Sequence, residues 1–253
     1  LLMYFFQDYC IEKSEKFHLI QLTDADFPAH CHPAYEFIFV TQGSAQVWID
    51  GQKYALKPND GALIFSNQVH RFVLAANTKL DLVIFSGELL SDFHYCYQNK
   101  LPTFPVVHAM KLPFKPSANS STFEVKAYLY WVCEQFVKNT TFRTREKDIS
   151  SDLFSQLLQW VLANYQKECN LKSLAEEFSY DYQYLSKLFK QKTGIGFNHY
   201  VHLLRILKAE ELLEATDDSV QTIAETVGYN SLRSFHRNYK AITGHAPLKK
   251  HLR

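Results

Sequence analysis

The spacing of apolar and polar positions divides the chain into three segments. Up to about residue 100, apolar residues come in short runs, and turn-forming residues separate the runs at intervals of about ten positions. The runs are "EFIFVT", "SAQVWI", "QKYALK", "GALIFS", "RFVLAA" and "LDLVIFS". Short strands in this arrangement predict a β-sandwich or β-barrel.

One β-hairpin is predicted inside this segment, around Asp50-Gly51. Both residue types tolerate positive φ, and Asp-Gly between alternating runs is a strong hairpin signal. Val47 and Ile49 lie on one face of the first strand. Tyr54 and Leu56 reach the same face after the turn.

The second segment begins with an extended connector and continues into helices. Residues 101–121 contain four of the eight prolines. "STFE" at 121–124 is a capping box before an apolar helical run that ends at about residue 138. A further helix over about 147–165 places one apolar stripe at helical spacing: Ile149, Leu153, Phe154, Leu157, Leu158, Val161 and Leu162. Both apolar stripes either pack within the chain or, for one of them, form a dimer surface.

The third segment contains a repeated unit. "SLAEEFSYDYQYLSKLFKQKTG" at 173–194 matches "TIAETVGYNSLRSFHRNYKAITG" at 222–244. The offset is 49 residues at first and 50 residues after the turn, so one extra residue lies in the second turn. A repeat that keeps its apolar pattern across such an insertion is one supersecondary unit used twice.

Each copy reads as a helix, a tight turn and a second helix, which is the helix-turn-helix pattern. Asn170, Asp181 and Ser231 are predicted to cap helices. The predicted buried positions are Leu171, Leu174, Ala175, Phe178, Leu185, Leu188 and Phe189 in the first copy, and Ile223, Ala224, Val227, Phe235, Tyr239 and Ile242 in the second. A long apolar-faced helix over 197–216 joins the copies, so that one chain could contact two successive turns of a DNA groove, about 10 base pairs apart.

The opposite face of each second helix carries polar side chains at positions i, i+3, i+4 and i+7. They are Gln183, Ser186, Lys187 and Lys190 in the first copy, and Arg233, His236, Arg237 and Lys240 in the second. A single polar stripe is usually only solvated. Two stripes in matching frame inside helix-turn-helix units favour contact with base edges and phosphates in a major groove.

Charge supports this interpretation only weakly. The chain has a net charge of +1, and residues 166–253 carry 13 basic and 10 acidic side chains. A mildly basic segment permits a polyanionic partner without requiring one. The five cysteines are scattered and form no C-x-x-C pair, so we expect reduced thiols rather than disulfides or a zinc finger. No secretory signal or membrane span is predicted, and we expect a cytoplasmic protein.

Residues 170–248 resemble the DNA-binding domain of the AraC/XylS family of bacterial transcription regulators. The resemblance rests on "LAEEF", "YLSKLFKQKTG", "RILKAEELL", "IAETVGY", "FHRNYKAITG" and Pro247. It implies base contacts from the helices that follow Asp181 and Ser231. Ser179 and Leu232 depart from the family pattern, in which a Gly and a polar residue are common.

Residues 25–90 resemble a cupin-type β-barrel, a frequent sensor domain in this family. His30, His32, Glu36 and Gly43 match its first motif, and His70 stands where the second motif places a histidine. Phe65 and Asn67 depart from that motif.

Two histidines on one strand face, a carboxylate and a third histidine suit Zn, Mn or Fe. The chain must reverse near Pro33-Ala34 for Glu36 to join them. Three interpretations stay open: a bound metal, an effector pocket without metal, and structural polar groups. We include Trp48 among the predicted effector-binding residues. No cofactor is predicted beyond this candidate metal.

The sequence therefore predicts an α+β protein. Residues 1–100 form a cupin-like effector-sensing barrel, 101–165 a connector with helices, and 166–253 a DNA-binding domain with helix-turn-helix units at about 170–194 and 219–244. The predicted function is a DNA-binding transcription regulator that responds to a small-molecule effector. The predicted partners are double-stranded DNA, the effector, a second copy of the chain and, by resemblance, RNA polymerase. The alternative is a metal-dependent cupin oxygenase or isomerase that uses His30, His32, Glu36 and His70.

Overall fold

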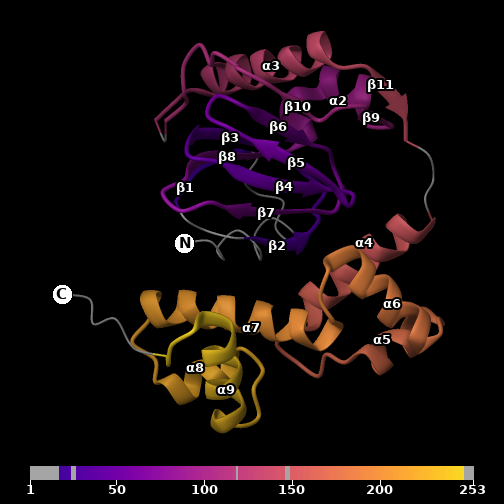
Figure 1. Cartoon of the computed structure of the whole chain (residues 1–253), viewed down its shortest axis with the longest axis vertical. Coiled ribbons are helices and arrows are strands. Elements are labelled where there is room, and N and C mark those ends of the chain that lie inside the picture. The colour runs from indigo at the N-terminus through magenta and orange to yellow at the C-terminus, as the bar shows by residue number, and fades with distance from the viewer. Residues whose placement is uncertain (1–16, 24–26, 118, 146–148, 248–253) are drawn as a thin grey trace. The chain divides into compact units, whose positions relative to one another are not determined.

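The computed structural model of the chain describes residues 17–23, 27–117, 119–145 and 149–247, with the side chains of residues 149 and 151 outside this description (Figure 1). The chain divides into two compact units, one over Glu12–Ser151 and the other containing Asp152–Arg253. Among the described residues, no helix is long and apolar enough to cross a membrane.

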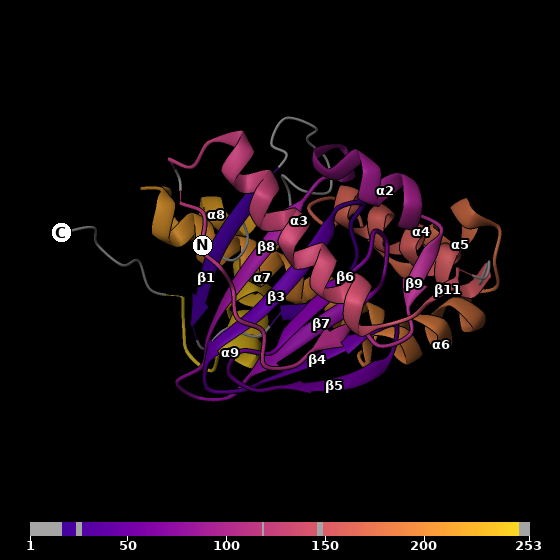
Figure 2. The same cartoon turned by 90° about the horizontal axis from the view of Figure 1, so that it is seen from above.

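Two antiparallel sheets form the body of the N-terminal unit (Figures 1 and 2). The five-stranded sheet has the order β1-β8-β3-β6-β10, with β1 at Phe17–Thr23, β8 at Lys79–Phe85, β3 at Tyr35–Gln42, β6 at Gly61–Ile64 and β10 at Val106–Val107. The four-stranded sheet has the order β2-β7-β4-β5, with β2 at Phe27–His30, β7 at His70–Leu74, β4 at Ala45–Ile49 and β5 at Gln52–Leu56. A small third sheet pairs β9 (Lys100–Pro102) with β11 (Phe142–Thr144).

Strand β3 is buried on both faces, and the alternation of its side chains separates two environments. Phe37 and Phe39 point outward into the core shared with the helix α3 (Thr122–Asn139). Successive side chains of a strand point to opposite faces, so Glu36 and Ile38 point toward the other sheet. This alternation places one buried carboxylate in the space between the sheets.

Helical segments cover the outer face of the five-stranded sheet (Figure 2). They are the 3-10 helix η1 (Gly87–Leu90), α2 (Ser91–Tyr97) and α3. Ser121 caps α3 by accepting a hydrogen bond from the backbone N–H of Glu124, as the capping box predicted. The inner side of α3 is apolar and fully covered, and its outer side leaves Phe123 and Tyr130 exposed.

The C-terminal unit is all-helical. It contains α4 (Ile149–Asn164), α5 (Leu171–Phe178), α6 (Tyr182–Thr193), α7 (Phe197–Ala215), α8 (Val220–Thr226) and α9 (Leu232–Thr243). The rings of Phe154 on α4 and Phe189 on α6 pack edge to face, 5.4 Å apart. The sequence grouped α4 with the connector, whereas this contact joins it to the helices that follow, and the compact unit begins at Asp152.

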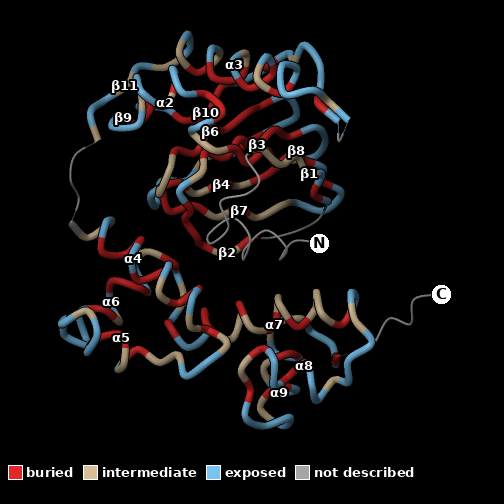
Figure 3. The backbone as a smooth tube through the Cα atoms, turned by 180° about the vertical axis from the view of Figure 1, so that it is seen from behind, coloured by how far each residue is buried: buried red, intermediate tan, exposed pale blue. Residues whose placement is uncertain are grey.

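The structure confirms the predicted fold class and most predicted elements. Asp50 and Gly51 both have positive φ, and Val47 pairs with Tyr54 across the hairpin. The predicted caps Asn170, Asp181 and Ser231 all accept backbone N–H groups. The predicted apolar positions of the repeat are buried, except that Phe178 and Ile242 are half-buried. Figure 3 shows buried and exposed stretches alternating along the helices of this unit. Six elements of the described residues were not predicted: β1, η1, α2, β9, β10 and β11.

Candidate functional site: a buried histidine–glutamate cluster and two exposed helix faces

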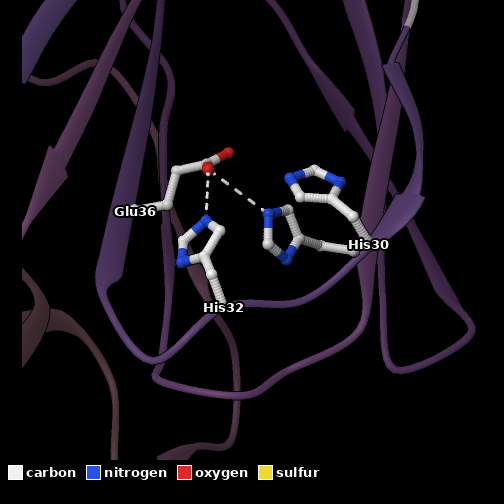
Figure 4. Close-up of side chains that lie close together, drawn as sticks. His30, His32 and Glu36 are labelled. Carbon is white, nitrogen blue, oxygen red and sulfur yellow. Dashed lines mark hydrogen bonds and ion pairs between the residues drawn. The ribbon is translucent and has the colours of Figure 1, made fainter. Parts of the chain in front are cut away.

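Four side chains that the sequence selected meet between the two sheets. His30, His32, Glu36 and His70 are all buried, and one donor atom from each lies within 4.8 Å of the others. Figure 4 shows His32 and Glu36 joined by a hydrogen bond, with the ring of His30 beside them. The predicted convergence is therefore confirmed.

The backbone that brings them together differs in one detail from the expectation. β2 ends at His30, where it pairs with His70 on β7, so His32 lies in the connection and not on the strand. The chain bends at Pro33-Ala34, as required, and β3 then carries Glu36 back into the cluster. The prediction that both histidines share one strand face is wrong, because the bend begins immediately after β2.

Each histidine ring is oriented by a backbone carbonyl. The Nδ1 atoms of His30, His32 and His70 lie 2.9, 3.2 and 2.8 Å from the carbonyl oxygens of Pro28, Ala34 and Gln68, respectively. A carbonyl oxygen only accepts hydrogen bonds, so each Nδ1 carries the proton. In a neutral ring, the lone pair is then on Nε2.

The Nε2 atoms meet the carboxylate. Glu36 Oε2 lies 3.1 Å from His32 Nε2 and 3.3 Å from His70 Nε2. Two lone pairs at this distance repel each other, so each contact requires a proton or another cation between nitrogen and oxygen. The second carboxylate oxygen, Glu36 Oε1, is buried and has no hydrogen-bond partner among the described residues.

The electrostatics of the cluster reflect this demand for positive charge. Burial lowers the pKa of His30 well below its usual value, and the neighbouring His70 adds to the effect. Burial opposes ionisation of Glu36, but the charge of His70 and hydrogen bonds from both neighbouring rings outweigh it and lower the pKa. Burial likewise opposes charge on His70, but the Glu36 carboxylate outweighs it and raises the pKa.

The donor set fits a divalent transition metal ion. Such ions are bound by histidine nitrogen and carboxylate oxygen at about 2.0–2.2 Å, so two donors on opposite sides of an octahedral ion are about 4.2 Å apart. The spread of 4.8 Å in the cluster is close to that value. Histidine ligands usually donate their other N–H to a carbonyl or carboxylate, which is the arrangement of all three rings. The orphaned Glu36 Oε1 supplies a further donor atom.

Trp48 is not part of this cluster. On β4, Val47 and Ile49 are buried, and Trp48 between them points to the opposite face. Ile49 pairs with His70, whereas Trp48 pairs with Arg71, whose guanidinium carbon lies 3.6 Å from the centre of the indole ring. Strand alternation therefore turns Trp48 away from the histidine–glutamate cluster, and its predicted contact with the effector stays a prediction.

The second candidate site consists of the exposed faces of α6 and α9. Both helices have twelve residues. Each begins directly after a capping residue and is followed by a glycine in the left-handed conformation. Seven of the eight predicted DNA contacts are exposed, and Ser186 is half-buried. Leu185, Phe189 and Phe235, which lie between these positions in the sequence, are fully buried. The two faces therefore match position by position at an offset of 50 residues.

The helices are held by a shared framework. Arg205 on α7 donates hydrogen bonds to the carbonyl oxygens of Tyr165 and Lys167, which connect α4 to α5. His202 on α7 bonds to the hydroxyl group of Tyr229, in the turn before α9. Hydrogen bonds from α7 therefore hold the segments that precede α5 and α9.

Comparisons with known proteins give the same division. The AraC-like ligand binding domain family matches residues 18–131, and a helix-turn-helix domain family matches residues 174–250. The HTH-type transcriptional activator RhaS of Pectobacterium carotovorum subsp. carotovorum is 26% identical over 240 residues, which cover 87% of this chain and 86% of RhaS. RhaS of Escherichia coli O1:K1 is 24% identical over 236 residues, covering 85% and 84% of the two chains.

Solved structures show the same fold. ToxT from Vibrio cholerae, in a crystal structure with an unsaturated fatty acid bound, matches with a TM-score of 0.54 and 12% identity, covering 93% of this chain and 94% of ToxT. A second crystal structure of ToxT matches with a TM-score of 0.54 and 14% identity, covering 93% and 96%. The predicted regulator, rather than the predicted alternative of an enzyme, is confirmed. With its N-terminal ligand-binding domain and its C-terminal helix-turn-helix domain, the chain belongs to the AraC family of DNA-binding transcription regulators.

Proposed function

We propose that the chain activates transcription by binding double-stranded DNA through α6 and α9, in response to a ligand held at the histidine–glutamate cluster. The observation that carries the DNA contact is the pair of exposed polar faces in matching frame on two capped helices. The direction of regulation follows the similar RhaS proteins, which are named as activators.

The side chains on these faces divide into two roles. Arg233 and Arg237 present guanidinium groups that suit guanine, and Gln183 presents an amide that suits adenine. Lys187, Lys190 and Lys240 suit phosphates, which position the protein without reading sequence. Ser186 and His236 supply further hydrogen-bonding groups beside them.

The test uses the full chain and duplexes selected from a random-sequence pool, with affinity measured by fluorescence anisotropy at several salt concentrations. We expect Lys240→Ala to weaken binding to all duplexes and to lower the salt slope by about 1. Arg237→Ala should cost about 1–3 kcal/mol and relax the preference at one base position.

Lys138→Ala is the matched control, because Lys138 is also exposed but lies on α3. It should leave affinity and salt slope unchanged. Failure of the full chain to enrich any duplex, or equal loss from the control variant, would contradict the proposal.

We propose further that the cluster binds one divalent transition metal ion through His30, His32, Glu36 and His70. Support comes from the three Nδ1–H groups fixed on backbone carbonyls and from the two Nε2 atoms that face one carboxylate oxygen. Such a site needs a cation, and three nitrogens with one carboxylate match Zn²⁺, Mn²⁺ or Fe²⁺.

Metal content of the purified protein and calorimetric titration with ZnCl₂ and MnCl₂ test this second proposal. We expect one ion per chain, and Glu36→Gln should weaken binding by at least about tenfold. His108→Gln is the control, because the His108 side chain is 60% exposed and lies outside the cluster. A protein that neither retains nor binds metal would contradict this second proposal. The ligand would then be an organic effector in the same barrel, and thermal-shift measurements with small metabolites would identify it.

We propose that the regulator acts as a dimer and, as an activator, contacts RNA polymerase. The outer side of α3 exposes Phe123 and Tyr130, at 86% and 39%, and the nearby α2 exposes Tyr95 at 81%. We expect a second copy of the chain to cover this apolar surface. Sedimentation of the full chain should show a dimer that Phe123→Lys weakens, with Lys138→Ala unchanged.

A further inference from the structure

Large apolar side chains are exposed at the start of both α6 and α9, the two helices proposed to contact DNA. Among the described residues of the C-terminal unit, the exposed large hydrophobic side chains are Tyr180, Tyr182, Tyr184 and Leu232. All four lie within one turn of the N-terminus of α6 or α9. Single exposed apolar residues are normal on protein surfaces, but here they gather at one functional position.

Tyr182 and Leu232 occupy the same position in the repeated unit. Each is the first residue of its helix, directly after the capping residue, and the two are related by the offset of 50 that relates α6 to α9. Their side chains are 52% and 41% exposed. Each precedes a predicted base contact, Gln183 or Arg233.

The other two tyrosines are already engaged with each other. The rings of Tyr180 and Tyr184 stack with their centres 5.7 Å apart at an angle of 21°. No comparable ring contact of Tyr182 is found within the described part of the chain. Tyr182 therefore presents its apolar ring to whatever the helix binds.

The chemistry common to the two positions is apolar contact. A tyrosine hydroxyl group could donate to a phosphate, but Leu232 has no polar group in its side chain, so a phosphate does not explain both. The N-terminal residues of a recognition helix are the ones that contact base edges. The apolar group that base edges display in the major groove is the C5-methyl group of thymine.

The charges around these residues favour DNA over an apolar protein surface. Lys187 and Lys190 are exposed on the same helix as Tyr182, and Arg233 and Arg237 are exposed on the same helix as Leu232. The carboxylate of Asp181 accepts the backbone N–H groups of Gln183 and Tyr184, both at 2.9 Å, so its charge is directed at the helix N-terminus.

We propose that Tyr182 and Leu232 each contact the C5-methyl group of a thymine, one in each half of the DNA site. This inference rests on the proposed DNA contact by α6 and α9. It predicts a thymine at equivalent places in the two half-sites, next to the bases contacted by Gln183 and by Arg233.

The test replaces thymine by deoxyuridine, which lacks only the methyl group and keeps every hydrogen-bonding group. A duplex selected by the full chain from a random pool is synthesised with each thymine replaced in turn, and affinity is measured by anisotropy at constant salt. We expect one position in each half-site where the replacement weakens binding about three- to fivefold, the effect of one buried methyl group.

Two variants assign these positions. Leu232→Ser should remove the sensitivity to deoxyuridine in one half-site and leave it in the other, and Tyr182→Ser should do the reverse. Phe104→Ser is the matched control, since Phe104 is 45% exposed but lies in the N-terminal unit. It should preserve both sensitivities.

The outcomes separate this inference from the proposed function. A chain that selects a duplex but tolerates deoxyuridine everywhere overturns the methyl contacts and leaves DNA binding intact. If Tyr182→Ser and Leu232→Ser both keep the sensitivity to deoxyuridine, the assignment is overturned. The same holds if each variant loses affinity equally for the thymine duplex and for the deoxyuridine duplex. A chain that enriches no duplex instead contradicts the proposed function itself.

Discussion

Ser179 ends α5 in a conformation that favours glycine, with φ 56° and ψ 40°. The equivalent turn of the second unit uses Gly228, with φ 94°. A Cβ atom on Gly228 would lie 2.6 Å from the carbonyl oxygen of Gln166, so a glycine is required there. Ser179 is exposed, and its backbone N–H still bonds to the carbonyl oxygen of Glu176. The first turn therefore tolerates a side chain at the cost of backbone strain.

We expect Ser179→Gly to raise the free energy of unfolding of the C-terminal unit by about 0.5–1 kcal/mol, the relief of left-handed strain less the entropy of an added glycine. Gly228→Ala should lower it by more than this gain, because the added methyl group meets backbone. Urea denaturation of the full chain, followed by far-UV circular dichroism, measures both. Ser179→Ala is the control, with little change expected; an equal effect of Ala and Gly at position 179 would refute the strain argument.

The cluster shows how far single residues could be predicted from sequence. Motif spacing predicted that His30, His32, Glu36 and His70 converge, and the structure brings their donor atoms within 4.8 Å of one another. The orientation of the rings could not be predicted, since it depends on the carbonyl groups of Pro28, Ala34 and Gln68. These carbonyls turn toward the rings only because the backbone bends there. The separation of Trp48 from the cluster was not predicted either, since it depends on which face of β4 is turned inward.

Among the elements, those with a periodic pattern and a capping residue were predicted well. α6 and α9 begin one residue after the predicted caps, and each is followed by a glycine in the left-handed conformation. The unpredicted β9, β10 and β11 have two or three residues each, and they exist because partners far away in sequence pair with them. Such strands carry no local signal, since their hydrogen bonds are set by the tertiary fold.

The cap of α6 permits a test that separates helix stability from DNA charge. Asp181 Oδ1 accepts two backbone N–H groups, and Asp181→Ala should cost about 1 kcal/mol of stability. Asp181→Asn keeps a capping oxygen and removes one negative charge beside the exposed polar face of α6. We expect it to preserve stability and to strengthen DNA binding about two- to fivefold at low salt, as for an exposed charge pair worth about 0.5–1 kcal/mol.

Affinity as a function of salt measures this second effect, which should shrink as salt screens the charges. Asp218→Asn removes the same charge from an exposed loop of the same unit and serves as the control. If Asp218→Asn strengthens DNA binding as much as Asp181→Asn does, the effect comes from net charge and not from the position of Asp181 beside the exposed polar face of α6.

Across the whole molecule, a chain of hydrogen bonds runs from the cluster to the segment that precedes the helical unit. The backbone N–H of Asn67 donates to the carbonyl oxygen of His32 at 2.8 Å. The guanidinium group of Arg145 donates to the carbonyl oxygens of Ser66 and Asn67, at 2.8 and 3.3 Å. Gln68, the next residue, orients the ring of His70. Arg145 therefore holds the loop that positions two of the four cluster residues, and it stands seven positions before Asp152, where the helical unit begins.

This arrangement predicts that Arg145 couples occupancy of the cluster to DNA binding. Ligand coupling between sites is typically worth about 1–3 kcal/mol, and it acts equally in both directions. The coupling is the ratio of DNA dissociation constants without and with ZnCl₂, and it must equal the ratio of metal dissociation constants without and with DNA. We expect Arg145→Gln to bring both ratios close to one while metal and DNA each still bind. Arg143→Gln removes an exposed arginine from the neighbouring strand β11 and should leave the ratios unchanged. Unaltered ratios in Arg145→Gln would show that the two sites communicate by another route, because the loop at Ser66 and Asn67 would then have lost its clamp without consequence.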